Sequence, residues 1–239
     1  MVASRRSGGD EIDRLGEKVC PAAARRSAIV VRIEDAAHTR RWSTGRVEAF
    51  SDGVFAIAIT LLVLELKVPH VGDGGNDRLA AALLAQWPSY LAFVTSFATI
   101  LIMWVNHHRM FNFVRRVDAR LLYANGLLLF VVTVVPFPTA LVAEYFEKPE
   151  ASTAAAVYGG TFVLCSIAYN ILWRTAIGRQ RRLLRADVSE ANIRDLTRRY
   201  LWGLPLYALA TAAAFVSVQA TFAICLGLWV FWVVAARNT

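Results

Sequence analysis

Cysteine is scarce in this sequence, and the few cysteines follow no recognisable spacing. The 239 residues contain 3 of them, Cys20, Cys165 and Cys225. An odd number at unrelated spacings does not fit a disulfide framework or a CxxC metal site. We interpret them as small apolar residues within helices, or as thiols of a reduced compartment.

Motifs that carry catalysis are also missing. The chain has no P-loop, no GxGxxG and no Ser/His/Asp arrangement. His107 and His108 are adjacent, so on a helix they point in different directions, and neither the HExxH spacing nor a carboxylate partner accompanies them. The sequence therefore predicts that the protein is not an enzyme, holds no metal and binds no cofactor.

Charge is sparse, and long uncharged runs take its place. Only 18% of the residues are charged, 56% are hydrophobic and the mean hydropathy is +0.44, whereas soluble domains are usually about 45–50% apolar. A helix of about 20 apolar residues crosses a bilayer. We predict an all-α, polytopic membrane protein with six transmembrane helices, at 41–68, 79–107, 121–143, 153–173 and twice within 200–236.

The last apolar run decides the number of spans. Its 37 residues are too many for one helix and barely enough for two. Basic residues stand at both ends, at Arg198, Arg199 and Arg237, so two spans return the chain to the side from which it came. We therefore predict a tight turn near 217–221.

The connecting segments give further expectations. Residues 69–78 are rich in turn-forming residues and predict a loop. The two prolines of the PFP sequence at 136–138 predict a break near the far end of the third span. The strongly charged segment 174–199 is interpreted as a helix on the membrane surface.

Basic residues are distributed unequally between the two sides of the predicted membrane. Segments 1–46, 107–120, 174–199 and the C-terminus hold 10, 4, 8 and 1 of the 26 Lys and Arg residues, and the opposite loops hold the remaining 3. Positive charge accumulates on the cytoplasmic side. The pattern places both termini in the cytoplasm and favours a cell inner membrane. It also accounts for the net charge of +8 without a nucleic-acid partner.

The N-terminal residues differ in character from the rest of the chain. Residues 1–40 are mixed, charged and rich in Ala and Arg, and they contain no apolar run long enough for a signal peptide. We interpret 1–40 as a poorly ordered cytoplasmic extension and 41–239 as the membrane domain. No internal repeat is evident, so any symmetry must come from several copies of the chain.

The stretch 46–68 of the first span is unusual because it combines acidic residues near its ends with no charge from Gly53 to Leu64. At 100° per residue, one face consists of Gly53, Ile57, Thr60, Leu61 and Leu64, extended by Phe50 and Arg46. The opposite face consists of Phe55, Ala58, Leu62 and Leu66. The first face is either an ordinary packing surface or the wall of a narrow apolar pore.

The start of this span resembles the transmembrane protein 175 family of lysosomal and bacterial potassium channels. The resemblance rests on Arg46-x-x-x-Phe50-Ser51-Asp52 followed by GVFAIAITLLVLEL. WVNHHRMF at 104–111, Asn125 in LYANGLLLF and VVPFPTALV at 134–142 fit the bacterial members. The similarity covers about residues 42–236.

The resemblance implies a potassium-selective channel. In the family, the first helices of the subunits surround the pore, the bacterial members are homotetramers, and bulky aliphatic side chains narrow the path. By position Ile57 corresponds to the constriction and Thr60 to a pore-facing threonine, with Leu61 and Leu64 completing the neck. The resemblance implies that potassium is the permeant ion and that the partners are further copies of the chain and the lipid bilayer.

The polar residues around the first span form a second group of candidates. The resemblance assigns the Arg46 motif to a structural network that holds the pore helix. Asp52 lies about 120° from Arg46, so we expect each to bond to another helix. A bond from a histidine to Asp52 or Arg46 is preferred. The predicted network is Arg46, Phe50, Ser51, Asp52, Asn106, His107, His108 and Asn125.

Two alternatives stay open at this point. The first is a proton-coupled secondary transporter in which Asp52, His107 and His108 relay protons. Transporters commonly contain inverted repeats and helices broken at the midplane, and this sequence has neither. The second is a membrane scaffold without transport, which the polar motif of the first span disfavours.

Overall fold

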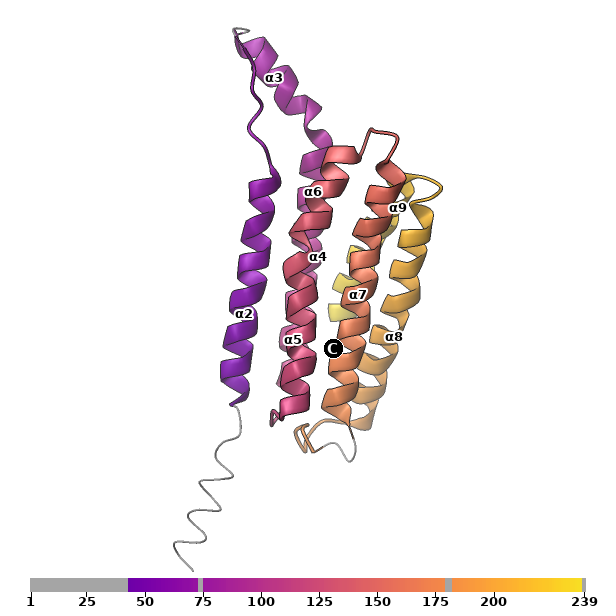
Figure 1. Cartoon of the computed structure of the whole chain (residues 1–239). Helices are drawn as coiled ribbons and strands as arrows, with labels where there is room; N and C mark the ends of the chain where they lie inside the picture. Colours follow the sequence, from indigo (N-terminus) through magenta and orange to yellow (C-terminus); the bar gives the residue numbers. More distant parts are fainter. Residues whose placement is uncertain (1–42, 73–74, 179–181, 238–239) are drawn as a thin grey trace, which may run out of the picture. The chain divides into compact units, whose positions relative to one another are not determined.

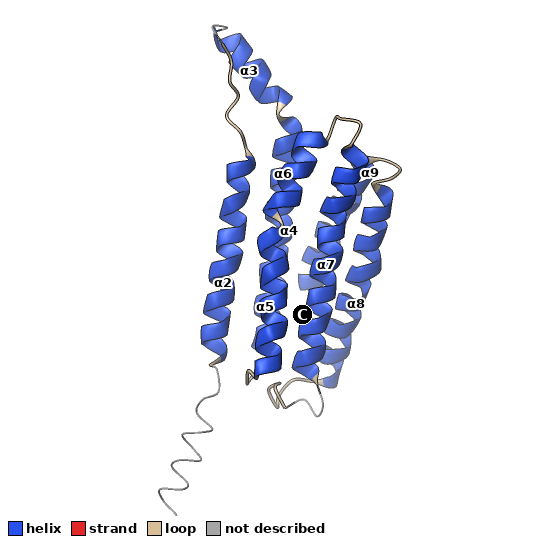
Figure 2. Ribbon diagram, in the orientation of Figure 1, coloured by secondary structure: helices blue, strands red, loops and turns tan. Residues whose placement is uncertain are grey.

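The computed structural model describes residues 43–72, 75–178 and 182–237, with side chains up to Val233. These residues form helices joined by loops, apart from one isolated bridge between Val114 and Leu184 (Figures 1 and 2). The predicted extension 1–40 lies outside the described residues. The elements are α2 (Thr44–Leu61), the short 3-10 helix η1 (Leu62–Glu65), α3 (Gly75–Ala85), α4 (Trp87–Asn112), α5 (Ala119–Val134), α6 (Pro136–Tyr145), α7 (Ala151–Ile177), α8 (Glu190–Ala213) and α9 (Val218–Arg237).

The predicted all-α membrane fold is confirmed. Among the described residues, four helical stretches are long and apolar enough to cross a bilayer: Thr44–Glu65, Trp87–Asn112, Ala119–Tyr145 and Ala151–Ile177. α8 and α9 follow, joined by a short turn into an antiparallel pair, and α9 contains a shorter apolar stretch, Val218–Val233. α8 packs along α7, and α9 packs against α8 and α4. The turn between them lies at 214–217, slightly before the predicted position.

The PFP sequence breaks the third span as predicted. α5 ends at Val134 and α6 begins at Pro136. Proline has no N–H with which to bond the carbonyl of Val132, and the backbone N–H of Val135 donates to that carbonyl instead, at 3.1 Å. The break therefore does not leave the carbonyl of Val132 without a donor.

Two predicted boundaries were wrong. The second span does not begin at 79, because α3 ends at Ala85 and α4 begins at Trp87, with Pro88 in the first helical turn, where its missing N–H costs nothing. Residues 174–199 do not form one surface helix. α7 continues to Ile177, and α8 begins at Glu190 and runs from its charged first turns directly into its apolar part.

α7 and α8 approach each other closely at Gly159. A Cβ added there would lie 2.7 Å from Oγ1 of Thr211 and 3.0 Å from its Cα. At Gly160 an added Cβ would meet nothing within 4 Å. Gly159 therefore allows the close approach of the two helices, whereas its neighbour Gly160 does not take part in it.

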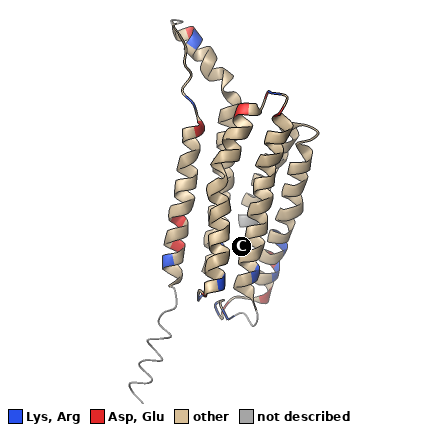
Figure 3. Cartoon of the chain, viewed as in Figure 1, with Lys and Arg blue, Asp and Glu red and all other residues tan. Residues whose placement is uncertain are grey.

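Charged residues gather toward the two ends of the bundle. Figure 3 shows that the stretches between the ends are almost entirely free of Lys, Arg, Asp and Glu. The end that holds the start of α2, the α4–α5 turn and the start of α8 is the basic end. This end is used below as the reference for position along the helices.

Candidate pore helix

α2 packs against α4 and α5 through one face only. Its buried residues are Val47, Ser51, Phe55 and Ala58, followed by Leu62 in η1. They are spaced by three or four residues, as expected for one side of a helix. Phe55, Ala58 and Leu62 belong to the face opposite the candidate pore stripe and are buried, whereas Leu66 on the same face is only half-buried.

The opposite face of α2 is uncovered along its whole length. Phe50 is 66% exposed, Ile57 58% and Leu64 71%. Such exposure of apolar side chains indicates a surface that meets lipid or another protein copy. Within this stripe the hydroxyl of Thr60 donates to the carbonyl of Ile57 at 2.9 Å. The other exposed residues of the stripe are Arg46, Gly53 and Leu61.

A chain of buried hydrogen bonds joins α2 to α4 and α5. Nε2–H of His107 donates to Oδ1 of Asn125 at 2.8 Å, and Nδ2–H of Asn125 donates to Oγ of Ser51 at 2.9 Å. The hydroxyl of Ser51 in turn donates to the carbonyl of Val47 at 2.8 Å. The three side chains are each 1% exposed or less. Because every donor finds an acceptor, this polar contact fixes α2 without leaving an unpaired group in an apolar interior.

Aromatic rings enclose His107 on both sides. Its ring is stacked on that of Phe111, with centroids 4.5 Å apart, and the ring of Phe55 lies 5.4 Å away at a tilt of 57°. Phe55 belongs to the buried face of α2. The imidazole is therefore held by packing as well as by hydrogen bonding.

Asp52 makes the second polar contact between α2 and α4. Its Oδ1 accepts a hydrogen bond from Nε1–H of Trp104 at 2.8 Å, and the ring of Trp104 is stacked on that of His108 at 6.3 Å. The expectation that a histidine bonds to Asp52 or Arg46 was wrong, because His107 bonds to Asn125. Trp104 was not among the predicted members of the network, because its spacing from Asp52 in the sequence gives no signal of this bond.

Three other members of the predicted network lie elsewhere. Arg46 and Phe50 are exposed on the outer stripe of α2, and among the described residues the side chain of Arg46 has no hydrogen bond or ion pair. Asn106 donates to the carbonyl of Ile102 in its own helix, and its backbone carbonyl accepts from the hydroxyl of Tyr200. Asn106 thus faces α8, and the structure does not bring it to α2.

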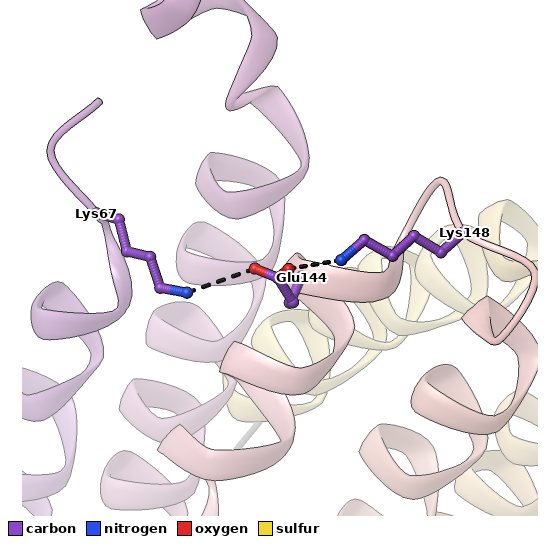
Figure 4. Close-up of polar contacts among 3 residues, drawn as sticks. All are labelled: Lys67, Glu144 and Lys148. Atoms are coloured by element: carbon purple, nitrogen blue, oxygen red, sulfur yellow. Dashed lines mark hydrogen bonds and ion pairs between the residues drawn. The ribbon is translucent and has the colours of Figure 1, made fainter. Parts of the chain in front are cut away.

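An ion pair ties the other end of the α2–η1 stretch to α6. Nζ of Lys67 lies 3.4 Å from Oε2 of Glu144, and Oε1 of the same carboxylate lies 2.5 Å from Nζ of Lys148 (Figure 4). The hydrogen bond with Glu144 raises the pKa of Lys148. All three side chains are well exposed, so this contact adds little stability. It joins the segment after η1 to the end of α6, and the sequence analysis had not identified it.

Comparisons with known proteins point to one family. The family model described as "Endosomal/lysosomal potassium channel TMEM175" matches residues 46–136. A protein of Chamaesiphon minutus named a potassium channel is 51% identical over 189 residues, which cover 79% of this chain and 93% of that protein. A protein of Streptomyces collinus, also named a potassium channel, is 50% identical over 182 residues, or 75% of this chain and 86% of the relative.

A solved structure agrees with the sequence comparisons. The crystal structure of a lysosomal potassium-selective channel TMEM175 homologue from Chamaesiphon minutus matches with a TM-score of 0.73 and 49% identity. The match covers 81% of this chain and 97% of that chain. The similarity thus extends over almost all of the solved protein and is not confined to the first helix.

Proposed function

Because this chain belongs to the TMEM175 family, we propose that it forms a potassium-selective channel in which α2 of each subunit lines a central pore. The relatives named above support the activity. The single observation that carries the assignment of the pore is the uncovered stripe of α2, which has no charge from Gly53 to Leu64. The opposite face of the same helix is held by two side-chain hydrogen bonds from other helices, Asn125 to Ser51 and Trp104 to Asp52.

Several copies are needed, because a single helix cannot enclose a path. We propose a homotetramer in which the stripes of α2 face a common axis. Ile57 forms the narrow neck, and Thr60, Leu61 and Leu64 continue its wall. The hydrogen bonds that hold α2 in its orientation then lie on the side of the helix away from the pore. The residues that make them do not contact the ion; they include Ser51, Asp52, His107 and Asn125.

Selectivity at an apolar neck follows from the cost of removing water from the ion. Potassium holds its hydration shell less tightly than sodium, so it passes a narrow apolar ring at a lower cost. We propose a multi-pass protein of the plasma membrane with both termini cytoplasmic, which the excess of Lys and Arg in 1–46, 107–120 and 174–199 supports. The basic end of the bundle is then the cytoplasmic end.

The test is ion flux into proteoliposomes that contain the purified protein. Ile57→Asn places an amide at the proposed neck and is expected to raise conductance and lower the preference for potassium over sodium. Ile171→Asn is the matched control, since Ile171 is 40% exposed on α7, away from α2. If Ile57→Asn and Ile171→Asn both conduct as the wild type does, the neck is not at Ile57.

Single-channel recording separates the channel from the proton-coupled transporter. A channel produces unitary current steps in a planar bilayer, whereas a transporter moves ions too slowly for such steps. Potassium flux without unitary steps, abolished by Asp52→Asn, is the result that would favour the transporter.

A further inference from the structure

A cavity between α4, α8 and α9 lies at the basic end of the bundle. It has a volume of about 220 Å³, and α4 contributes Asn106, Arg109 and Asn112 to its wall. The wall is completed by Phe113, Asn192, Leu196, Arg199 and Trp232. Two arginines and three asparagines within one cavity offer many N–H donors and, apart from the amide oxygens, few acceptors.

The donors of this cavity suit a phosphate group. An arginine guanidinium presents five N–H groups in a planar fork that matches phosphate oxygens. Arg199 is held in place by an ion pair with Asp195 at 2.7 Å, and only 17% of its side chain is exposed. Because Arg199 is already ordered and partly desolvated, binding of an anion beside it costs little additional side-chain entropy.

A second, smaller cavity continues the first toward the middle of the membrane. Its volume is about 40 Å³, and Asn106 and Trp232 belong to the walls of both cavities. Its wall is mostly apolar or aromatic and includes Ile102, Met103 and Tyr207. The path therefore changes from basic and polar at the end of α4 to apolar one to two turns further along the same helix.

This order of polarity is that of a phospholipid, with its charged head at the membrane surface and its glycerol ester and chains deeper. Basic pockets between transmembrane helices on the cytoplasmic side are recognised sites for anionic headgroups. α2 packs mainly against α4 and α5 (Figure 1). The cavity, in contrast, is bounded by α4, α8 and α9. This step rests on the proposed function. In the proposed homotetramer, α2 faces the central axis and the cavity between α4, α8 and α9 faces the surrounding lipid.

We infer that the cavity between α4, α8 and α9 binds the headgroup of an anionic phospholipid of the cytoplasmic leaflet. Arg109 and Arg199 contact the phosphate, and the side-chain amides of Asn106, Asn112 and Asn192 bond to the phosphate and glycerol oxygens. The apolar cavity beyond Trp232 receives the first part of an acyl chain. The lipid bridges α4 and α8 and stabilises their packing.

The first experiment measures lipid retention. The full chain is purified in detergent and mixed with equal amounts of phosphatidylglycerol and phosphatidylcholine, and the bound lipids are counted by native mass spectrometry. The wild type is expected to retain phosphatidylglycerol in preference. Asn112→Glu, an exposed position on the cavity rim, adds a negative charge and is expected to weaken this retention about ten-fold or more.

Arg198→Gln is the matched control. Like Asn112→Glu, it changes the net charge by one unit at the basic end of the bundle, but Arg198 is exposed and does not line the cavity. It is expected to retain phosphatidylglycerol as the wild type does. If Asn112→Glu and Arg198→Gln lose phosphatidylglycerol to the same extent, the retention depends on general surface charge, and the proposed site is wrong.

Two further variants separate the site from the fold. Arg109→Gln combined with Arg199→Gln is expected to abolish the preference for phosphatidylglycerol. Asp195→Asn keeps Arg199 and a side-chain oxygen that can accept from it, but removes the negative charge that competes with the phosphate, so it is expected to retain the lipid at least as well as the wild type. If Asp195→Asn loses the lipid as fully as the double variant does, the ion pair and not the anion site is responsible, and the inference fails.

Inorganic phosphate distinguishes a lipid from a soluble anion. Addition of millimolar phosphate is expected to leave phosphatidylglycerol bound, because the apolar cavity contributes to binding. Complete displacement of the lipid by phosphate would assign the cavity to a free anion. None of these measurements needs ion conduction, so their failure and the failure of the proposed channel activity are distinguishable.

Discussion

Asn125 is the residue through which α4 and α5 hold α2. Its amide accepts from His107 and donates to Ser51, and no water is needed to complete the chain. Replacement by leucine keeps the approximate volume and removes both bonds, which leaves the buried N–H of His107 without an acceptor. We expect Asn125→Leu to lower the free energy of unfolding by about 1–3 kcal/mol. Thermal melting of the detergent-solubilised protein, followed by the loss of its monodisperse elution peak, measures the change.

Thr133→Val is the control for the loss of stability predicted for Asn125→Leu. Thr133 also lies on α5, but its hydroxyl is exposed and bonds only to the carbonyl of Phe130 in its own helix. Its replacement should change stability by no more than about 0.5 kcal/mol. Equal melting temperatures for Asn125→Leu and Thr133→Val would mean that the buried network does not hold α2.

The two faces of α2 could be predicted from the sequence, but its polar partners could not. Helical periodicity alone separates Phe55 and Ala58 from Ile57 and Leu64, because positions on one helix are related by a fixed angle. The bond between Asp52 and Trp104 depends on how α2 and α4 are placed relative to each other. No local pattern in a sequence contains that distance, so the choice among several polar candidates required the structure.

The contact between α7 and α8 tests close packing at the scale of whole elements. Gly159→Ala places a methyl group against the backbone of Thr211, so the two helices must separate. We expect a loss of about 1–3 kcal/mol in stability, as for other overpacked contacts. Gly160→Ala is the neighbouring control, since the added methyl meets nothing within 4 Å and alanine favours a helix. A melting temperature of Gly159→Ala at or above that of Gly160→Ala would show that α7 and α8 accommodate the added methyl group without a loss of stability.

Elements were predictable where the sequence carried a backbone signal. The PFP break was foreseen because proline removes an N–H at a known position. The separation of α3 from α4 was missed, since the apolar character continues through Gln86 and only the geometry of the turn ends α3. The charged start of α8 was misplaced on the membrane surface for a different reason. A helix can continue from water into lipid without a break, because its backbone bonds are internal in both.

The whole molecule presents one helix whose exposed face is apolar and whose buried face is hydrogen-bonded. α2 occupies one edge of the bundle, and its contacts are mainly with α4 and α5 (Figure 1). A lipid-facing helix would need only the apolar surface. The two side-chain bonds fix the rotation of α2 about its own axis, and a fixed rotation matters most when copies of the same stripe meet.

Oxidative cross-linking tests whether these stripes meet. In a background in which the native cysteines are replaced by alanine, Ile57→Cys places a thiol at the proposed neck. Leu164→Cys places one on the outer face of α7, where the leucine is similarly exposed, 55% against 58% for Ile57. A disulfide requires Cα atoms within about 7 Å. Copper-phenanthroline treatment of dilute, detergent-solubilised protein should therefore give covalent dimers for Ile57→Cys and none for Leu164→Cys on a non-reducing gel. Dimers from Leu164→Cys alone would place the interface between copies on α7, and the stripe of α2 would then face lipid.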